Sequence, residues 1–368
     1  MSRLDWALEQ VGSVRAVAVL RIAIGPITLL HLRPFLRDAR AGVSYTDHFW
    51  EPFISWLPEL SDRLWFGLLW LGAAAAVLMT VGLCTRVASA VTFAVVAFNL
   101  LLSQTHFHHN TVFLAIVLFG VALLPSGREL SIDAWLRRRM RRPALPTVVP
   151  LWPLWLLRGQ IGLVYLASGG SKLIDPDWFG GLVLWDRMVR NQHVLDPTPL
   201  PAWSIDVLTS RWLFFILGPV IVGTELFIGL GLWFARTRLA AIWMAILFHI
   251  AIEISAHVQV FSYAAIAALA IWVTPTTRDR TVVVGGESGT ARAVVALVRA
   301  GDWFARFRIE TAGPAAPALT VVDRGGTVLH GWGATRIVLS RLPLTFPFFA
   351  PLLLPSRLRR VDHAGAAT

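Results

Sequence analysis

The sequence LVYLASGGSKLIDPDWFGG, residues 163–181, continues directly from an apolar run and contains a single lysine, Lys172. The apolar part predicts a membrane-spanning helix, and the polar part predicts a site at its end. A charged amine at the edge of hydrocarbon either extends to water or loses its proton, and a lysine without that proton is a base. Lys172 is therefore the first candidate catalytic residue.

The composition of the whole chain is that of a membrane protein. Of its 368 residues, 56% are hydrophobic and 15% are charged, and the mean hydropathy is +0.63. One water-soluble core cannot bury so much apolar surface, so we predict an α-helical polytopic membrane protein. The net charge of +11 comes mainly from arginines between apolar runs, which favours anionic lipid over nucleic acid as a partner. Cys84 is the only cysteine, which excludes an internal disulfide and a thiolate metal cluster.

Eight apolar runs predict about eight membrane spans, of which the fourth and seventh are short. They lie at residues 14–35, 64–83, 87–102, 111–124, 151–167, 212–234, 239–254 and 258–273. The polar N-terminal sequence MSRLDWALEQVGSVR predicts no cleaved signal peptide, so the first run would serve as the anchor.

The basic run RRRMRR, residues 137–142, sets the predicted orientation. Basic loops stay on the cytoplasmic side, which also places both termini there. The opposite side then receives the cluster His106, His108 and His109, the loop after Lys172, and residues 255–257. We expect a multi-pass protein of a bacterial plasma membrane.

Two charged residues lie inside predicted spans, Arg158 in the fifth and Glu225 in the sixth. At a rise of 1.5 Å per residue, both lie roughly 12 Å from the cytoplasmic edge. Equal depth predicts a buried ion pair, because neither charge is stable alone in hydrocarbon. The favoured interpretation is a structural clasp.

Two further patterns surround this region. His249, Glu253 and His257 are spaced by four, which places them along one helix face. They could bind a metal, relay protons, or form a polar stripe bonded to neighbouring helices. After Lys172, an amphipathic segment with Trp178 predicts an interfacial helix, a lid that excludes water from the amine, or both.

We predict two domains, residues 1–277 in the membrane and residues 278–368 as a small cytoplasmic α/β unit. Its strands are predicted at 281, 307, 319 and 325 onward, with helices over 290–304 and from 334. The apolar sequence LPLTFPFFAPLLLP, residues 342–355, contains prolines and is short, which favours a membrane-surface or docking segment over a span.

Several motifs together resemble one known family. They are FHHNTVFL from Phe107, LLPSGRELSID from Leu123, GLVYLASGGSKLIDPDWFGG from Gly162, the span with Glu225, and LFHIAIE from Leu247. Over most of residues 21–275 the chain resembles the vitamin K-dependent γ-carboxylase-like family, also called HTTM (horizontally transferred transmembrane). The arrangement Lys–Leu–x–Asp–x–x–Trp, from Lys172 to Trp178, is the most specific marker.

The resemblance implies that Lys172 is the base that deprotonates reduced vitamin K or menaquinol. Oxygenation of the quinol would then supply a base strong enough to remove a glutamate γ-proton, because no protein side chain is. Asn110 and His249 would lie in the quinol pocket. The family's carboxylases often have histidine where this chain has Thr111. His108 or His109 would replace it, although their register is shifted, and we predict that His109 and Trp178 belong to the cofactor site. No metal is expected.

The C-terminal part, residues 278–368, is similar to a DCC thioredoxin-like domain. That domain opens with Asp–x–x–Cys–x–x–Cys after its first strand, where this chain has GGESGTAR, residues 285–292. Without cysteines it cannot perform dithiol chemistry. A docking or regulatory module and a stabilising remnant are the two open interpretations.

Three functional hypotheses follow. The first is a membrane enzyme that oxygenates a lipid quinol and modifies a substrate. No match to the region that grips carboxylation substrates is present, so the second is a non-catalytic membrane factor that binds lipid or a secreted peptide during maturation. The third is a metal-dependent oxidase built on His249, Glu253 and His257. The sequence predicts neither the substrate nor the oligomeric state.

Overall fold

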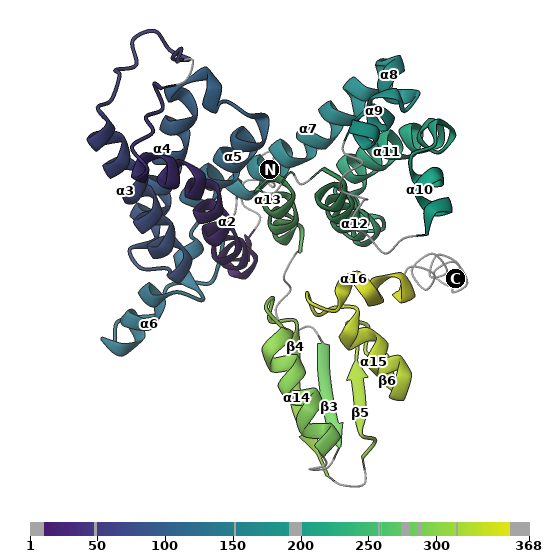
Figure 1. The fold of residues 1–368 in the computed structure, drawn as a ribbon. Coiled ribbons are helices and arrows are strands. Elements are labelled where there is room, and N and C mark those ends of the chain that lie inside the picture. The colour runs from purple at the N-terminus through teal and green to yellow at the C-terminus, as the bar shows by residue number, and fades with distance from the viewer. Residues whose placement is uncertain are drawn as a thin grey trace, which may run out of the picture. The chain divides into compact units, whose positions relative to one another are not determined.

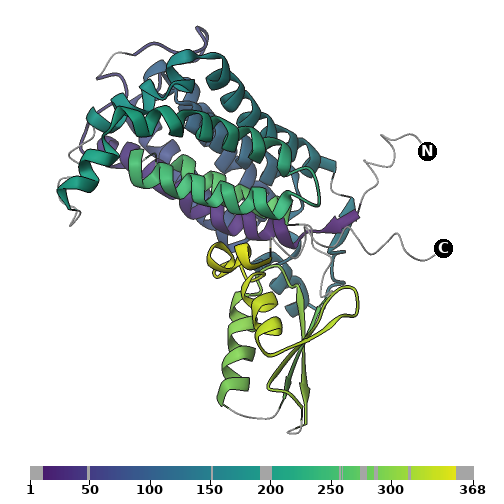
Figure 2. The same cartoon turned by 90° about the vertical axis from the view of Figure 1, so that its right-hand side faces the viewer.

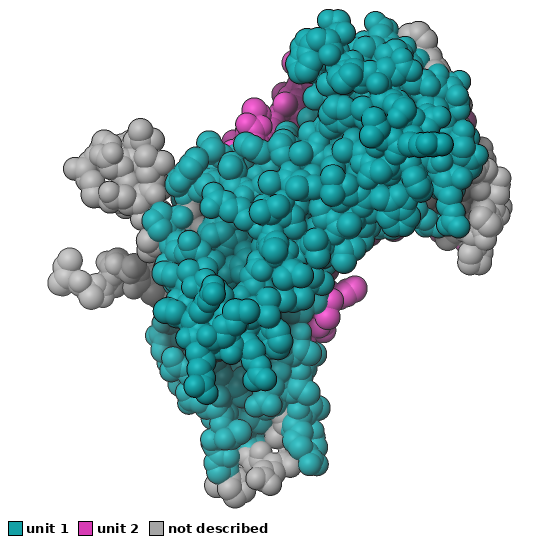
Figure 3. All heavy atoms as spheres, turned by 90° about the vertical axis from the view of Figure 1, so that its left-hand side faces the viewer, with its two compact units in different colours: residues 1–158, 263–335 teal, residues 159–262, 336–368 magenta. Residues whose placement is uncertain are grey.

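The computed structural model describes residues 11–47, 50–150, 152–190, 201–256, 258, 260–273, 280–285, 289–313 and 316–353. The chain divides into two compact units, coloured separately in Figure 3. Unit 1 comprises Met1–Arg158 and Tyr263–Thr335, and unit 2 comprises Gly159–Ser262 and Arg336–Thr368. This division follows spatial contacts, and the predicted domains 1–277 and 278–368 stay predictions. Each unit is described by itself.

Unit 1 begins with four helices that coincide with the first four predicted apolar runs. They are α2 (Arg15–Arg40), α3 (Asp62–Val81), α4 (Thr85–Leu102) and α5 (His109–Leu123). Consecutive helices pack against each other, and α2 also contacts α5 (Figure 1). Leu20, Leu69 and Leu118 are fully buried in this helical core. Burial of such apolar side chains is what holds neighbouring helices at close distance.

Short elements follow at one end of these helices. After α5 come η2 (Ser126–Arg128) and α6 (Ile132–Arg139), and the chain then forms β2 (Val148–Pro150), which pairs antiparallel with β1 (Val11–Ser13). The hydroxyl of Ser131 accepts a hydrogen bond from the Ala134 amide and so caps α6 at its start. The last turn of α6 contains Arg137 and its two arginine neighbours from the basic run.

The remaining part of unit 1 contains the last helical run and the sheet. The run forms α13 (Val260–Ala268) and η4 (Leu269–Trp272), and α13 begins within unit 2. The sheet elements are β3 (Arg280–Gly285), α14 (Gly289–Gly301), β4 (Phe307–Ala312), β5 (Leu319–Val322) and β6 (Val328–His330), followed by α15 (Gly331–Leu339). These strands and helices match the predicted positions.

The sheet has the order β4-β3-β5-β6. The pair β3 and β4 is parallel, whereas β5 runs antiparallel to both of its neighbours. A parallel pair needs a crossover connection, which α14 supplies; Figure 2 shows this helix beside the strands. An ion pair between Arg280 Nε and Asp323 Oδ1, at 2.7 Å, joins β3 to the turn after β5.

Unit 2 is helical. It contains α7 (Trp152–Ile174) from Gly159 onward, α8 (Pro176–Phe179), α9 (Leu182–Arg190), α10 (Ala202–Leu208), α11 (Arg211–Gly231) and α12 (Arg238–Ala256). Helix α11 packs against α8, α9 and α12. The predicted docking segment forms α16 (Phe346–Phe349) and η5 (Ala350–Leu353), which contact α12. There the indole of Trp243 donates a hydrogen bond of 2.7 Å to the Pro347 carbonyl.

All eight predicted apolar runs are helical, but not all are confirmed as spans. Within the described residues, four helices are long and apolar enough to cross a membrane, namely α2, α3, α4 and α11. Helix α5 and the stretch Val260–Trp272 are apolar but shorter. The chain is thus mostly helical with four candidate spans and a small sheet near its C-terminus, and the number eight stays a prediction.

Candidate functional site

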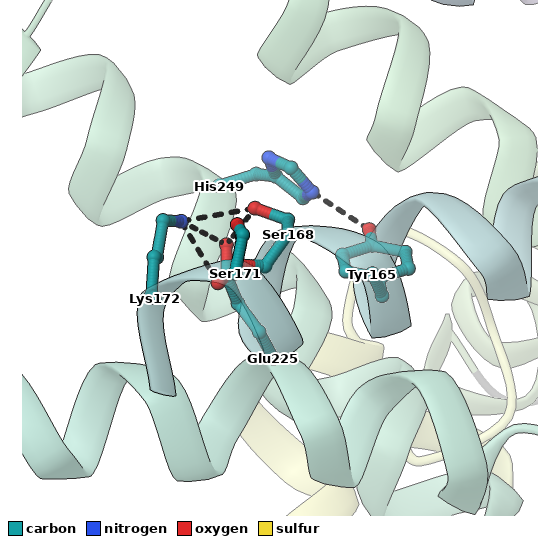
Figure 4. A network of polar contacts seen from close by, with 6 residues as sticks. All are labelled: Tyr165, Ser168, Ser171, Lys172, Glu225 and His249. Carbon is teal, nitrogen blue, oxygen red and sulfur yellow. Dashed lines mark hydrogen bonds and ion pairs between the residues drawn. The ribbon is translucent and has the colours of Figure 1, made fainter. Parts of the chain in front are cut away.

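Helix α7 is longer than the apolar run that predicted it, and its extra turns carry the candidate base. The run ends at Ala167, whereas the helix continues to Ile174. Tyr165, Ser168 and Lys172 are spaced by three and four residues, so they lie on one face of α7. This face turns toward α11 and α12, and Figure 4 shows the polar contacts that it makes.

Lys172 is bound to a buried carboxylate. Its Nζ donates hydrogen bonds to both carboxylate oxygens of Glu225, at 2.7 and 2.8 Å, and to Ser168 Oγ at 3.0 Å. The Ser168 hydroxyl in turn donates to Glu225 Oε1 at 3.1 Å. The side chains of Lys172 and Glu225 are 17% and 6% exposed. An ammonium group has three N–H donors, and each has an acceptor here.

Glycines let the helices approach closely enough for these contacts. A Cβ on Gly169 would lie 3.0 Å from the Leu226 side chain and 3.2 Å from Glu225 Cβ, so α7 and α11 touch at this level. Gly181, after α8, has a φ of +72°, and a Cβ there would collide with the Phe214 carbonyl of α11. The two glycines therefore fix α7 and the turn after it against α11.

Trp178 covers the amine. Asp175 caps α8 by accepting a hydrogen bond from the Asp177 amide at 2.9 Å, which fixes the turn that carries the indole. Lys172 Nζ lies 4.9 Å from the centroid of the Trp178 ring, and Arg187 Cζ lies 5.1 Å from the same ring. A cation at this distance is attracted to the face of an indole. The indole of Trp178 thus lies beside the amine, and its role as a lid stays a prediction.

His249 forms a second pair on the same face of α7. The Tyr165 hydroxyl and His249 Nε2 lie 2.7 Å apart, and the histidine is fully buried. The Phe261 ring packs edge-on against the imidazole at 5.3 Å. Among the described residues, His249 Nδ1 has no hydrogen-bond partner. A buried polar atom without a partner is destabilising, so a ligand that bonded Nδ1 would gain by doing so.

A family model described as the HTTM domain matches residues 12–276. The chain belongs to the HTTM domain family. The match confirms the family suggested by the lysine motif and is consistent with a membrane protein related to vitamin K-dependent carboxylases. No solved structure matches the chain.

Glu225 of this HTTM protein has a partner that the sequence did not predict. Its carboxylate is bound by Lys172. Arg158, the partner predicted for it, donates two hydrogen bonds to the Ile271 carbonyl within unit 1, at 3.1 and 2.6 Å, and its guanidinium lies over the Trp155 and Trp272 rings. The ion pair between Arg158 and Glu225 stays a prediction.

Asn110 and His109 belong to unit 1 of the HTTM domain. His108 caps α5, since its Nδ1 accepts a hydrogen bond from the Asn110 amide at 3.2 Å, and the rings of His108 and His109 are 4.4 Å apart. Partial burial lowers the pKa of His106, although the hydrogen bond from its Nδ1 to the Asn99 carbonyl opposes this shift. Contacts of Asn110 and His109 with a cofactor stay predictions.

The structure describes two of the three residues that were proposed to bind a metal. His249 and Glu253 lie on α12, but His257 is outside the described residues. Within the described part of the chain, no group of three or more histidine, cysteine or acidic side chains is placed to hold a metal ion. The His249, Glu253 and His257 stripe stays a prediction.

Two members of the site were missed in the sequence. Tyr165 lies in the apolar run and Ser168 directly follows it, and the sequence analysis identified neither as a site residue. The signal was present, because both precede Lys172 by whole helical turns and so share its face. Had the helix been extended past Ala167, this spacing would have identified them.

The Tyr165 and His249 contact gives a testable prediction. Tyr165→Phe removes the hydroxyl and leaves both imidazole nitrogens without partners, so we expect the free energy of unfolding to fall by about 1–3 kcal/mol. Thermal or denaturant unfolding of the purified protein in detergent measures the change. Ser171→Ala is the matched control, because this exposed hydroxyl bonds only the Ser168 carbonyl one turn away. Equal stability of Tyr165→Phe and Ser171→Ala would contradict the prediction.

Proposed function

We propose that this HTTM protein is a membrane enzyme of the vitamin K-dependent carboxylase-like class, which acts on a lipid quinol with Lys172 as general base. The observation that carries the proposal is the placement of the amine. Lys172 Nζ lies between the Glu225 carboxylate, the Ser168 hydroxyl and the face of Trp178, and it is only partly open to solvent. Titratable pairs in such shielded positions are typical of sites that move protons.

The residues around the amine fit a quinol. His249 Nδ1 is a buried polar atom without a partner among the described residues, and it suits a hydroxyl or carbonyl oxygen. The indole of Trp178 offers an aromatic face, and Lys172 Nζ offers a group that can exchange a proton. These three residues would hold the cofactor. A bound quinol would supply, on oxygenation, a base stronger than any protein side chain.

The role of Glu225 follows from the same geometry. An amine with three hydrogen-bond acceptors holds its protons, so it must release one before it can accept another. The Glu225 oxygens, at 2.7 and 2.8 Å from Nζ, are the nearest place for that proton. We infer that Lys172 and Glu225 act as one unit, in which the carboxylate takes the proton and the neutral amine becomes the base.

The direct test uses the purified full chain supplied with menaquinol and oxygen. The proposal expects quinone epoxide, detected by chromatography and mass spectrometry, and expects Lys172→Ala to abolish it. Ser171→Ala, next to the lysine on the exposed side of α7, is the control and should retain full activity. Epoxide formed equally by Lys172→Ala and the native chain would remove Lys172 from the mechanism.

One observation favours a second function, a non-catalytic factor that binds lipid or a secreted peptide. Because all three N–H donors of Lys172 are used, the cluster also fits a purely structural clasp. Lys172→Arg separates the two functions. Arginine keeps the charge and can bind Glu225 with two parallel hydrogen bonds, but it does not become a neutral base. If Lys172→Arg folds but no longer forms epoxide, the enzyme is supported. If Lys172→Arg keeps the biological function of the native chain, the structural clasp is supported.

We propose a thioredoxin-like fold for the sheet, supported by a parallel β3 and β4 pair joined by α14 and followed by the antiparallel strands β5 and β6. Of residues 285–292, where a DCC domain would have its cysteines, residues 286–288 lie outside the described part of the chain. We also propose a bacterial plasma membrane as the location, with both termini cytoplasmic.

A further inference from the structure

A cavity of about 850 Å³ lies in unit 1 at the end of the helices that carries the basic run. Its wall comes from the start of α4, the segment η2 after α5, helix α6 and the chain that leads to β2 and α7. None of these residues belongs to the Lys172 site. The cavity therefore needs an explanation of its own.

The wall of the cavity is strongly basic. Five arginines line it, against two carboxylates, and they are Arg86, Arg128, Arg137, Arg138 and Arg142. Of the two acids, Asp133 is already engaged, since it accepts hydrogen bonds from the Cys84 amide at 2.8 Å and from the Thr85 amide and hydroxyl at 2.8 and 2.7 Å. Within the described parts of the chain, none of the five arginines forms an ion pair with a carboxylate. The other acid, Glu129, has an Oε2 without a partner among the described residues, so five arginines outnumber one unengaged carboxylate and the wall has a net positive charge.

Two of these arginines are held in place by the backbone. Arg128 Nη1 donates to the Pro146 carbonyl at 3.0 Å, and Arg137 Nη2 donates to the Pro143 carbonyl at 3.2 Å. The Nε of Arg137 is buried and has no acceptor among the described residues. The backbone hydrogen bonds of Arg128 and Arg137 thus fix two guanidinium groups at the wall, and Arg137 Nε can still donate to a ligand.

The same cavity also has an apolar side. Leu123, Leu145 and Trp152 line it, and all three are exposed. A small inorganic anion would need only the arginines, whereas a phospholipid would use both sides. Planar guanidinium groups bind phosphate with paired hydrogen bonds, and basic pockets beside membrane helices bind anionic headgroups. We propose that this cavity binds the phosphate group of an anionic phospholipid, with an acyl chain along its apolar side.

The test compares two double variants of the same basic run in the full chain. Arg138→Gln/Arg142→Gln removes two charges that line the cavity, and Arg139→Gln/Arg141→Gln removes two charges that do not. Each protein, purified in detergent, is titrated with dioleoyl phosphatidylglycerol, and the unfolding temperature is followed. We expect the apparent affinity to fall roughly tenfold or more in the first variant and by less than about twofold in the second.

The results of these titrations support or overturn the phospholipid site as follows. Equal losses in both variants would show that only the total charge matters, and would overturn a defined pocket. Titration with inorganic phosphate distinguishes the two sources of the anion; stabilisation as strong as with the lipid would replace the phospholipid by a soluble phosphate. Neutral phosphatidylcholine should stabilise neither protein through these arginines. Should Arg138→Gln/Arg142→Gln not fold, Arg138→Lys/Arg142→Lys keeps the charge without paired bonding and is expected to bind more weakly than the native chain.

Discussion

Replacing Lys172 with alanine is expected to lower the free energy of unfolding by roughly 3–5 kcal/mol, because it leaves the Glu225 carboxylate buried without its cation. Glu225 is 6% exposed, and the hydrogen bond that it keeps among the described residues comes from the Ser168 hydroxyl, which cannot neutralise a charge. The lysine itself is 17% exposed, so some water can enter and the smaller end of this range is the better expectation. Glu225→Ala should have a similar effect, since it strands the ammonium group.

A double variant tests whether the loss of stability comes from the unpaired charge. In Lys172→Met/Glu225→Gln both charges are absent, the side chains keep a similar size, and the glutamine can still bond Ser168. We expect most of the lost stability to return, because removing a whole buried pair is often close to neutral. Unfolding in detergent, followed by tryptophan fluorescence, measures all the variants. Arg187→Met is the control, since this exposed cation contacts the same Trp178 ring without a buried partner.

The losses of stability in the single and double variants together show whether the two side chains act as a pair. If the double variant is as unstable as the sum of the two single ones, the side chains contribute independently and the pair is not the reason for the loss. A separate measurement of epoxide formation distinguishes stability from chemistry. The double variant is expected to fold and to be inactive, because it has neither the amine nor the carboxylate.

The helices and the unusual position of Lys172 at the end of an apolar run could be read from the sequence because both depend on local patterns. Apolar runs predict helices wherever their length is sufficient, and all eight runs are helical. The lysine was conspicuous because an amine at the end of such a run is unfavourable. Short runs of β-branched residues, TVVV from Thr281 and LTVV from Leu319, likewise located β3 and β5. In each case the information lies within one segment.

The partners of these residues could not be read in the same way. Which carboxylate meets Lys172 depends on where α7 ends and on how α7 and α11 are aligned, and the polar sequence SGGSK hid the last turns of the helix. Hydropathy measures the tendency to enter a membrane, and it gives no information on helix rotation. Tyr165 and Ser168 were missed for the same reason. The steric fit at Gly169, which sets the alignment, is visible only in three dimensions.

Arg21, in unit 1, is another residue whose partners could not be read from the sequence, and its replacement is expected to have a large effect on stability. It lies in the first predicted span, was not singled out, and is fully buried in α2. Its Nη1 donates to the Met79 and Thr80 carbonyls at 2.8 and 3.3 Å, and its Nη2 donates to the Leu130 carbonyl at 2.5 Å. Met79 and Thr80 are in the last turn of α3, where carbonyls lack partners within the helix. The arginine therefore caps α3 from a neighbouring helix and complements its dipole.

Arg21→Met is expected to lower the free energy of unfolding by about 3–5 kcal/mol, since hydrogen bonds from a charged donor are strong and the Thr80 and Leu130 carbonyls lose it. Arg33→Met, an exposed position on the same helix, should change stability by less than about 0.5 kcal/mol. Unfolding in detergent measures both. Gly82→Ala provides an independent check, because Gly82 has a φ of +73° and a methyl group there would collide with Arg21 Nη1. If Arg21→Met were as stable as Arg33→Met while Gly82→Ala was destabilised, the strain at Gly82, and not the arginine, would determine how α3 ends.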